Sequence, residues 1–125
     1  MTAPHPHVQL KRAYSAPSEA DGCRVLVDGL WPRGIKKETL RIEGWYRGLA
    51  PSGELRRWFG HRSEKWPEFR KRYLEELETH SDDIKEMVNK TEGRTLTLVY
   101  GARDEEHNNA VVLREYLLRH HLAKG

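Results

Sequence analysis

The sequence predicts a small three-layer α/β domain with a short, mostly parallel sheet flanked by helices. Two observations predict this class: short apolar runs typical of buried strands are separated by segments with helical periodicity, and the most strongly patterned strand-to-helix unit comes last. The 125 residues suffice for one modest core. We expect a single α/β domain over residues 8–125, preceded by a loose tail, Met1–His7, which contains two prolines.

Two strands are expected in the first part of the chain. Val8–Arg12 suits an edge strand, whereas Arg24–Asp28 carries three consecutive apolar residues that suit burial on both faces of a sheet. The link between them, Ala13–Gly22, contains many turn residues and is too short for a comfortable helical crossover. The relative direction of the two strands therefore stays open.

The loop Gly29–Gly34 cannot continue the second strand through the centre of a sheet. Pro32 lacks a backbone donor, and Gly34 permits a positive φ. We expect this loop to hold Arg33 in a stiff setting near the carboxyl end of the strand. Trp31 is expected to be a packing anchor rather than a stacking platform for a ligand.

Four helical segments are expected before the last strand. Their apolar residues recur at spacings that place them on one face of a helix. Glycine interrupts the first pattern, and Ser52 is placed to cap the second segment. The segments are Ile35–Leu49, Gly53–Phe59, a longer helix that begins at Ser63 or Trp66 and carries Leu77 in its buried stripe, and Ser81 to about Lys90.

Near residue 101 the sequence changes from the apolar pattern of a strand to the periodicity of a helix. Several polar residues lie between the two segments. Leu96–Tyr100 has the apolar, β-branched and aromatic composition of a buried strand. Asp104 is placed to cap a helix that runs to about His120. Helical geometry puts Glu106 and Asn109 on the inward face of that helix. Because α/β proteins bind ligands at the carboxyl ends of their strands, the sequence predicts a site here.

Five residues form the predicted site if the two central strands are parallel neighbours. Arg33 and Arg103 are candidates for holding an anionic group of a small ligand. Glu106 and His107 are candidates for catalytic proton transfer, and Asn109 for orienting the ligand. Taken singly, each residue is better explained by helix capping or solvation. Taken as a group, they favour a site for a small anionic molecule.

The composition of the chain and the absence of several known motifs argue against some classes of protein. The chain is 37% hydrophobic and 33% charged. It has no apolar run near the roughly 18 residues of a membrane-spanning helix, so a cytoplasmic location without membrane contact is expected. The lone cysteine, Cys23, agrees with a reducing compartment and is expected in the core or at an edge. Phosphate-binding glycine loops, zinc-protease motifs and CxxC pairs are absent, so no metal is predicted and the cofactor stays unknown.

An alternative function follows from the uneven charge. Residues 1–72 carry 15 Lys or Arg against 8 Asp or Glu, whereas residues 73–125 carry 7 against 11. The basic residues of Arg56–Arg72 are interleaved with aromatic residues, as in nucleic-acid-binding surfaces. The aromatic residues fall on inward helical positions, however, so nucleic-acid binding is second to a small anionic ligand. A regulatory module that acts through another protein is the third possibility. Enzymatic activity and oligomeric state stay open.

Three long motifs of the chain resemble a known family. They are DGCRVLVDGLWPRG (Asp21–Gly34), LAPSGELRRWFGH (Leu49–His61) and LVYGARDEEHNNAVVLREYL (Leu98–Leu117). In this order and spacing they are similar to the YeaO-like proteins, a bacterial family of unknown function. The resemblance covers nearly the whole chain after the first seven residues; it implies a small cytosolic α/β domain and brings no established catalytic residue. The family usually has an aromatic residue in place of Cys23 and an arginine in place of Gly29, so this chain has one basic group fewer beside Arg33.

Overall fold

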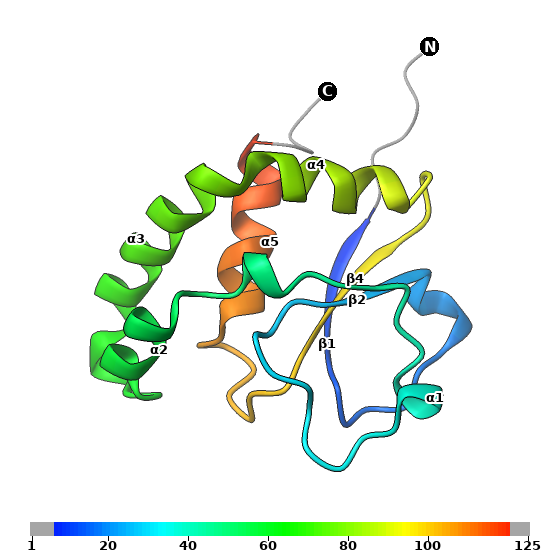
Figure 1. Cartoon of the computed structure of the whole chain (residues 1–125), viewed down its shortest axis with the longest axis horizontal. Coiled ribbons are helices and arrows are strands. Elements are labelled where there is room, and N and C mark those ends of the chain that lie inside the picture. Colours follow the sequence, from blue (N-terminus) through cyan, green and yellow to red (C-terminus); the bar gives the residue numbers. More distant parts are fainter. Residues whose placement is uncertain (1–6, 121–125) are drawn as a thin grey trace.

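A four-stranded, all-parallel sheet forms the centre of the protein (Figure 1). The computed structural model describes residues 7–120. The predicted tail, Met1–His7, therefore lies outside the described residues except for His7, whose carbonyl accepts a hydrogen bond from the Leu96 amide at 2.7 Å. The predicted mixed α/β class with a parallel sheet is confirmed. The strands are β1 (Val8–Arg12), β2 (Cys23–Leu26), β3 (Gly44–Trp45) and β4 (Leu96–Tyr100).

The last strand in the sequence, β4, lies near the centre of the sheet, between β1 and β2. Leu96 pairs with Val8 on one side and with Cys23 on the other. Because both pairings are parallel, β1 and β2 run in the same direction. The sequence had left the relative direction of these two strands open. The carboxyl ends of β2 and β4 lie side by side, so the loops that follow them meet at one edge of the sheet.

The two faces of the sheet are covered differently. Successive strand residues point to opposite faces. Val25 and Leu98 pack in the main core against the longer helices, whereas Leu26 and Val99 pack in a smaller cluster with Leu40 of the shortest helix. The helices are α1 (Lys37–Leu40), α2 (Gly53–Phe59), α3 (Trp66–Leu77), α4 (Ser81–Lys90) and α5 (Asn109–His120).

Three of the predicted helices are confirmed, namely those that became α2, α3 and α4. The Ser52 hydroxyl accepts the Leu55 amide at 3.1 Å, which is the predicted cap of α2. Helix α3 begins at Trp66, with Pro67 in its first turn where the missing N–H costs little. Within the described part of the chain, no helix is long and apolar enough to cross a membrane.

The predicted helix over Ile35–Leu49 is wrong. Only Lys37–Leu40 is α-helical, and Arg41 then adopts a left-handed conformation with φ of 56°. A single 3-10 turn, Arg47–Leu49, ends the segment. The chain continues as β3, which pairs with β2 and adds a fourth strand to the sheet. Its apolar residues therefore do not form one stripe of a helix. Ile35, Leu40, Ile42 and Trp45 cover the second face of the sheet, whereas Tyr46 and Leu49 pack in the main core.

Trp31 anchors this thin second layer, as predicted. Its ring contacts that of Trp45 edge to face at 5.4 Å, and its indole N–H donates to the Ile35 carbonyl at 2.6 Å. Both indole rings pack against the cluster of Leu26 and Val99. The loop after β2 is thus fixed by packing on the face opposite the long helices.

A buried polar network lies on the same face. Asp21 accepts hydrogen bonds from Lys11 at 3.0 Å, Arg24 at 2.8 Å and Gln9 at 3.0 Å. Gln9 also donates to the Thr97 hydroxyl, which donates in turn to the Asp21 carbonyl. Since these residues come from β1, β2, β4 and the link before β2, the network joins all three strands.

The lone cysteine belongs to the main core. Cys23 is fully buried, and burial raises the pKa of its thiol. A buried thiol with a raised pKa is a poor nucleophile. The prediction that Cys23 is a packing residue is confirmed.

Candidate ligand-binding site

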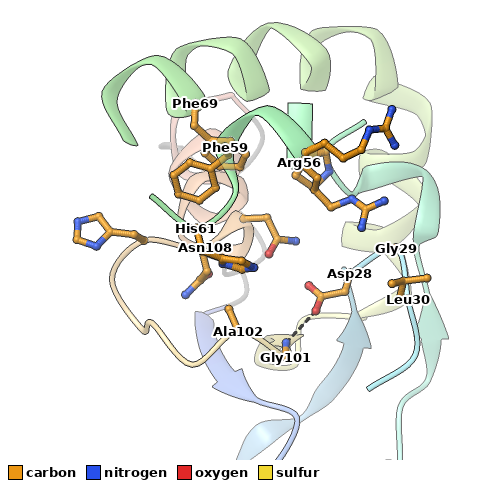
Figure 2. Close-up of a pocket in the computed structure, with 14 residues that line it drawn as sticks. Asp28, Gly29, Leu30, Arg56, Phe59, His61, Phe69, Gly101, Ala102 and Asn108 are labelled. Atoms are coloured by element: carbon orange, nitrogen blue, oxygen red, sulfur yellow. Dashed lines mark hydrogen bonds between the residues drawn. The ribbon is translucent and has the colours of Figure 1, made fainter. Parts of the chain in front are cut away.

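A cavity of about 400 Å³ opens at the carboxyl ends of β2 and β4 (Figure 2). The loop after each strand supplies one side of it. Helix α2 and the start of α5 supply the other sides, and Phe69 of α3 contributes from the core. The cavity is therefore located where the parallel strands and their helices predict a ligand site. Its lining residues are Asp28, Gly29, Leu30, Pro51, Arg56, Arg57, Phe59, His61, Phe69, Gly101, Ala102, His107, Asn108 and Asn109.

Asp28 follows β2 and is the acidic group of the cavity. Its Oδ2 atom accepts the Gly101 amide at 2.8 Å (Figure 2). Its Oδ1 atom is buried and has no hydrogen-bond partner among the described residues. Burial raises the pKa of the carboxyl group, although the Gly101 hydrogen bond, the nearby Asn109 amide and the charge of Arg56 act in the opposite direction.

Gly101 allows this contact between β4 and Asp28. A Cβ atom at position 101 would lie 3.3 Å from the Asp28 Oδ2 atom. That distance is shorter than an ordinary van der Waals contact, so a side chain here would displace the carboxylate. Glycine at the end of β4 therefore lets the backbone N–H approach and hold Asp28.

The basic side of the cavity comes from α2. Arg56 and Arg57 both line the cavity, and neither forms an ion pair with a described residue. The cap at Ser52 fixes the start of this helix, and the buried Phe59 fixes its inward face. The two guanidinium groups are therefore held by an ordered helix and remain available to an anion.

The apolar wall consists of aromatic rings. Phe59 and Phe69 both line the cavity (Figure 2), and their rings stack with centroids 4.3 Å apart. Trp66, which is not part of the lining, stacks on Phe69 at 5.5 Å. His61 lines the cavity just beyond the end of α2. Leu30, on the loop after β2, is 66% exposed. A ligand with an apolar or aromatic body would cover both the stacked rings and this exposed leucine.

The loop after β4 differs from the prediction. Helix α5 begins at Asn109, and Asn108 caps it by accepting the Val111 amide at 3.1 Å. The predicted Asp104 cap of this helix is wrong. Asp104 instead accepts the amides of Glu106 and His107 at 2.9 and 3.0 Å, which closes a local turn. An Asp side chain that binds its own neighbouring amides competes with helix formation, and this explains the later start.

Two of the five predicted site residues line the cavity. Asn109 donates to the Val27 carbonyl at 3.1 Å and so lies against the end of β2. His107 contacts Asp104 at 3.0 Å through Nδ1 and packs edge to face on Trp66 at 5.1 Å. The carboxylate that pairs with His107 is therefore that of Asp104.

The other three predicted residues lie outside this lining. Arg33, Arg103 and Glu106 are exposed. The Arg33 carbonyl accepts the Tyr14 hydroxyl at 3.0 Å, which ties its loop to the chain after β1. Their predicted roles, anion binding by the arginines and proton transfer by Glu106, stay predictions.

We expect Glu106→Gln to change the free energy of unfolding by less than about 1 kcal/mol, because charges at exposed positions contribute little. Denaturant unfolding of the variant and the wild type at pH 7 measures the difference. Glu105→Gln, the exposed neighbour, is the matched control. A loss of roughly 3 to 5 kcal/mol, typical of a broken buried ion pair, would contradict the exposed position of Glu106.

Sequence reasoning missed Asp28, Arg56 and Arg57 as residues of this site. The available signal for Asp28 was its position as the first polar residue after the central strand. For the arginines the only signal was a basic pair on a capped helix. The contact between that helix and the strand ends depends on tertiary packing.

The basic stretch Arg56–Arg72 is largely neutralised outside the cavity. Arg62 pairs with Glu64, Arg70 with Glu115 and Arg72 with Glu68. Trp58 is covered by the charged groups of Arg72 and Lys65 at 4.5 and 4.8 Å. Phe59 and Phe69 are buried apart from what lines the cavity, so they form no open surface on which a nucleic-acid strand could stack its bases. Among residues 7–120 there is also no group of three or more potential metal ligands.

The comparisons with known proteins identify the family. Residues 7–125 match a family model described as "Inactive DUF488-N3 subclade". The chain belongs to this family. "Uncharacterized protein YeaO" of Escherichia coli (strain K12) is 40% identical over 111 residues, which cover 89% of this chain and 96% of that protein. The predicted resemblance to YeaO-like proteins is confirmed.

Relatives outside Escherichia coli align over a similar span. "Uncharacterized protein Rv3073c" of Mycobacterium tuberculosis (strain ATCC 25618 / H37Rv) is 40% identical over 111 residues, which cover 88% of this chain and 92% of that protein. No solved structure matches the chain significantly. The candidate site therefore depends on the geometry of this chain alone.

Proposed function

We propose that this protein binds a small anionic molecule in the cavity at the carboxyl ends of β2 and β4. The observation that carries the proposal is the pair Arg56 and Arg57, which line the cavity and form no ion pair with a described residue. Guanidinium groups bind carboxylates and phosphates through charge-assisted, often paired hydrogen bonds. The volume of about 400 Å³ suits a metabolite rather than a polymer.

The proposal is binding without catalysis. The description of the matching family as inactive supports this choice. So does the position of Glu106, which is exposed away from the cavity lining and has no contact with His107 through its side chain. A cytoplasmic location forms part of the proposal, since the lone Cys23 cannot form a disulfide within the chain.

The nucleic-acid alternative gains no support from the arrangement of charges. Three of its arginines are paired with glutamates. Its aromatic residues are buried, except for Trp58, which lies under Arg72, and Trp66, which packs against Phe69 and His107. The two arginines without an acidic partner line the cavity, where a small anion fits better than a nucleic-acid backbone.

Replacing either cavity arginine should weaken anion binding. Hydrogen bonds to charged groups contribute roughly 1.5 to 3 kcal/mol each, so Arg56→Gln or Arg57→Gln should raise Kd by roughly 10- to 100-fold. The measurement is a thermal-shift screen of inorganic phosphate and of carboxylate and phosphate metabolites, followed by calorimetric titration of those that raise Tm.

Arg62→Gln provides the matched control, because Arg62 is on the same basic stretch but pairs with Glu64 outside the cavity. It should leave Kd unchanged. If no anion of the panel raises Tm, or if all three variants bind like the wild type, the proposed function is wrong.

A further inference from the structure

The carboxylate of Asp28 has one buried oxygen without a hydrogen-bond partner at the cavity. Oδ2 is satisfied by the Gly101 amide, but Oδ1 accepts no hydrogen bond from any described residue. Buried polar atoms in proteins are hydrogen-bonded in the great majority of cases. An exception that belongs to a cavity-lining residue marks a position where a donor from another molecule fits.

Two side-chain donors lie near Asp28, and neither forms a hydrogen bond to Oδ1. The Asn109 amide donates one N–H to the Val27 carbonyl at 3.1 Å and is also close enough to the Asp28 carboxyl to lower its pKa. The buried Tyr73 hydroxyl donates to the Leu49 carbonyl. Arg56 is near enough for its charge to act on Asp28 but forms no hydrogen bond with it. Among the described residues, Oδ1 therefore has no hydrogen-bond donor of its own.

We propose that Asp28 determines ligand specificity by accepting, at Oδ1, an N–H donor of the same small molecule whose anionic group binds Arg56 and Arg57. This inference rests on the proposed function. It names the ligand class as an anion that also carries an N–H donor, a chemistry shared by amino acids and by nucleotides.

The charges on the two sides of the cavity explain how Asp28 would distinguish anions with an N–H donor from anions without one. A carboxylate facing an anion that has no donor is both unpaired and repelled, whereas an N–H group satisfies it. Asp28 therefore disfavours simple anions and favours those with a donor at the right distance. The stacked rings of Phe59 and Phe69 suit an apolar or aromatic body between the two polar ends.

Two matched pairs of probes test the proposal on the full chain by calorimetric titration. In the amino-acid pair, L-phenylalanine carries an ammonium donor that 3-phenylpropionate lacks. In the nucleotide pair, guanosine 5′-monophosphate carries N–H donors on its base that purine riboside 5′-monophosphate lacks. We expect the donor-bearing member of one pair to bind at least about tenfold tighter, and the pair that shows the preference identifies the source of the ligand.

Asp28→Asn should reduce that preference to within about threefold while retaining affinity for the anion-only member. The amide oxygen of asparagine still accepts the Gly101 N–H, and thermal unfolding checks that the variant is folded. Asp82→Asn, at an exposed position on α4, is the control and should keep the wild-type preference.

The affinities of the wild type for the two members of each pair test the proposal even if Asp28→Asn does not fold. Equal binding of both members of each pair overturns the role of Asp28 but leaves anion binding intact. A preference that survives Asp28→Asn in a folded variant also overturns it. If neither these probes nor the anions of the wider panel bind the wild type, the proposed function fails together with this inference.

Discussion

Asp21→Ala should lower the free energy of unfolding by roughly 3 to 5 kcal/mol, as expected when one partner of a buried ion pair is removed. Asp21 is 1% exposed and pairs with Lys11 and with Arg24, which is itself 4% exposed. Without the carboxylate, the Arg24 guanidinium remains buried on the second face of the sheet with its charge uncompensated. Urea unfolding at pH 7 measures the loss.

An exposed ion pair provides the control for this loss. Arg62 and Glu64 pair at 3.0 Å but are 62% and 63% exposed. Glu64→Ala should therefore leave the free energy of unfolding nearly unchanged. Equal effects of the two substitutions would mean that burial of the Asp21 network contributes nothing.

The Asp21 network should also make the free energy of unfolding depend on pH. Burial raises the pKa of Asp21, but hydrogen bonds from the Ser18 amide, Lys11 and Arg24 outweigh it and lower the pKa from 3.8 to about 2. A group with a lowered folded pKa contributes stability above its unfolded pKa and loses it as pH falls through the folded pKa. The contribution should disappear between about pH 4 and pH 2 in the wild type, whereas Asp21→Ala should lack this part of the acid transition.

The fold was largely predictable because local patterns specify most of its elements. Alternating and continuous apolar runs marked β1, β2 and β4, and helical stripes with a serine cap and an early proline marked α2 and α3. The strand order was not predictable, because the insertion of β4 between β1 and β2 depends on contacts nearly ninety positions apart in sequence, such as Val8 with Leu96. The short strand β3 has two residues and no pattern of its own.

The location of the cavity was predictable, but most of its lining was not. The carboxyl ends of two parallel strands indicated the edge of the sheet, and His107 and Asn109 line the cavity there. Glu106 was misplaced because the Asp104 side chain binds the local amides and delays the helix to Asn109. Arg56 belongs to the cavity only because α2 packs against the strand ends, and no local pattern reports that packing.

Gly22→Ala should lower the free energy of unfolding by roughly 2 to 5 kcal/mol, combining a strained backbone with a steric clash. Gly22 has φ of 62° and ψ of −121°, a conformation that residues with a side chain rarely adopt. A Cβ atom there would lie 2.4 Å from the Thr95 carbonyl oxygen, which accepts the Cys23 amide at 2.7 Å. Relieving the clash would move the first pairing of β2 with β4.

Gly34→Ala separates the two contributions, because Gly34 also has a positive φ, 81°, but no atom lies within 4 Å of the position that its Cβ would occupy. It should cost only about 1 to 2 kcal/mol, the cost of the left-handed conformation alone. Urea unfolding of both variants gives the comparison, and the difference measures the contact with Thr95. A loss at Gly22 no larger than that at Gly34 would show that β2 tolerates a shift at its first residue. The larger loss that we expect would mean that the register of β2, and with it the position of Asp28 at its carboxyl end, depends on the absence of a side chain at residue 22.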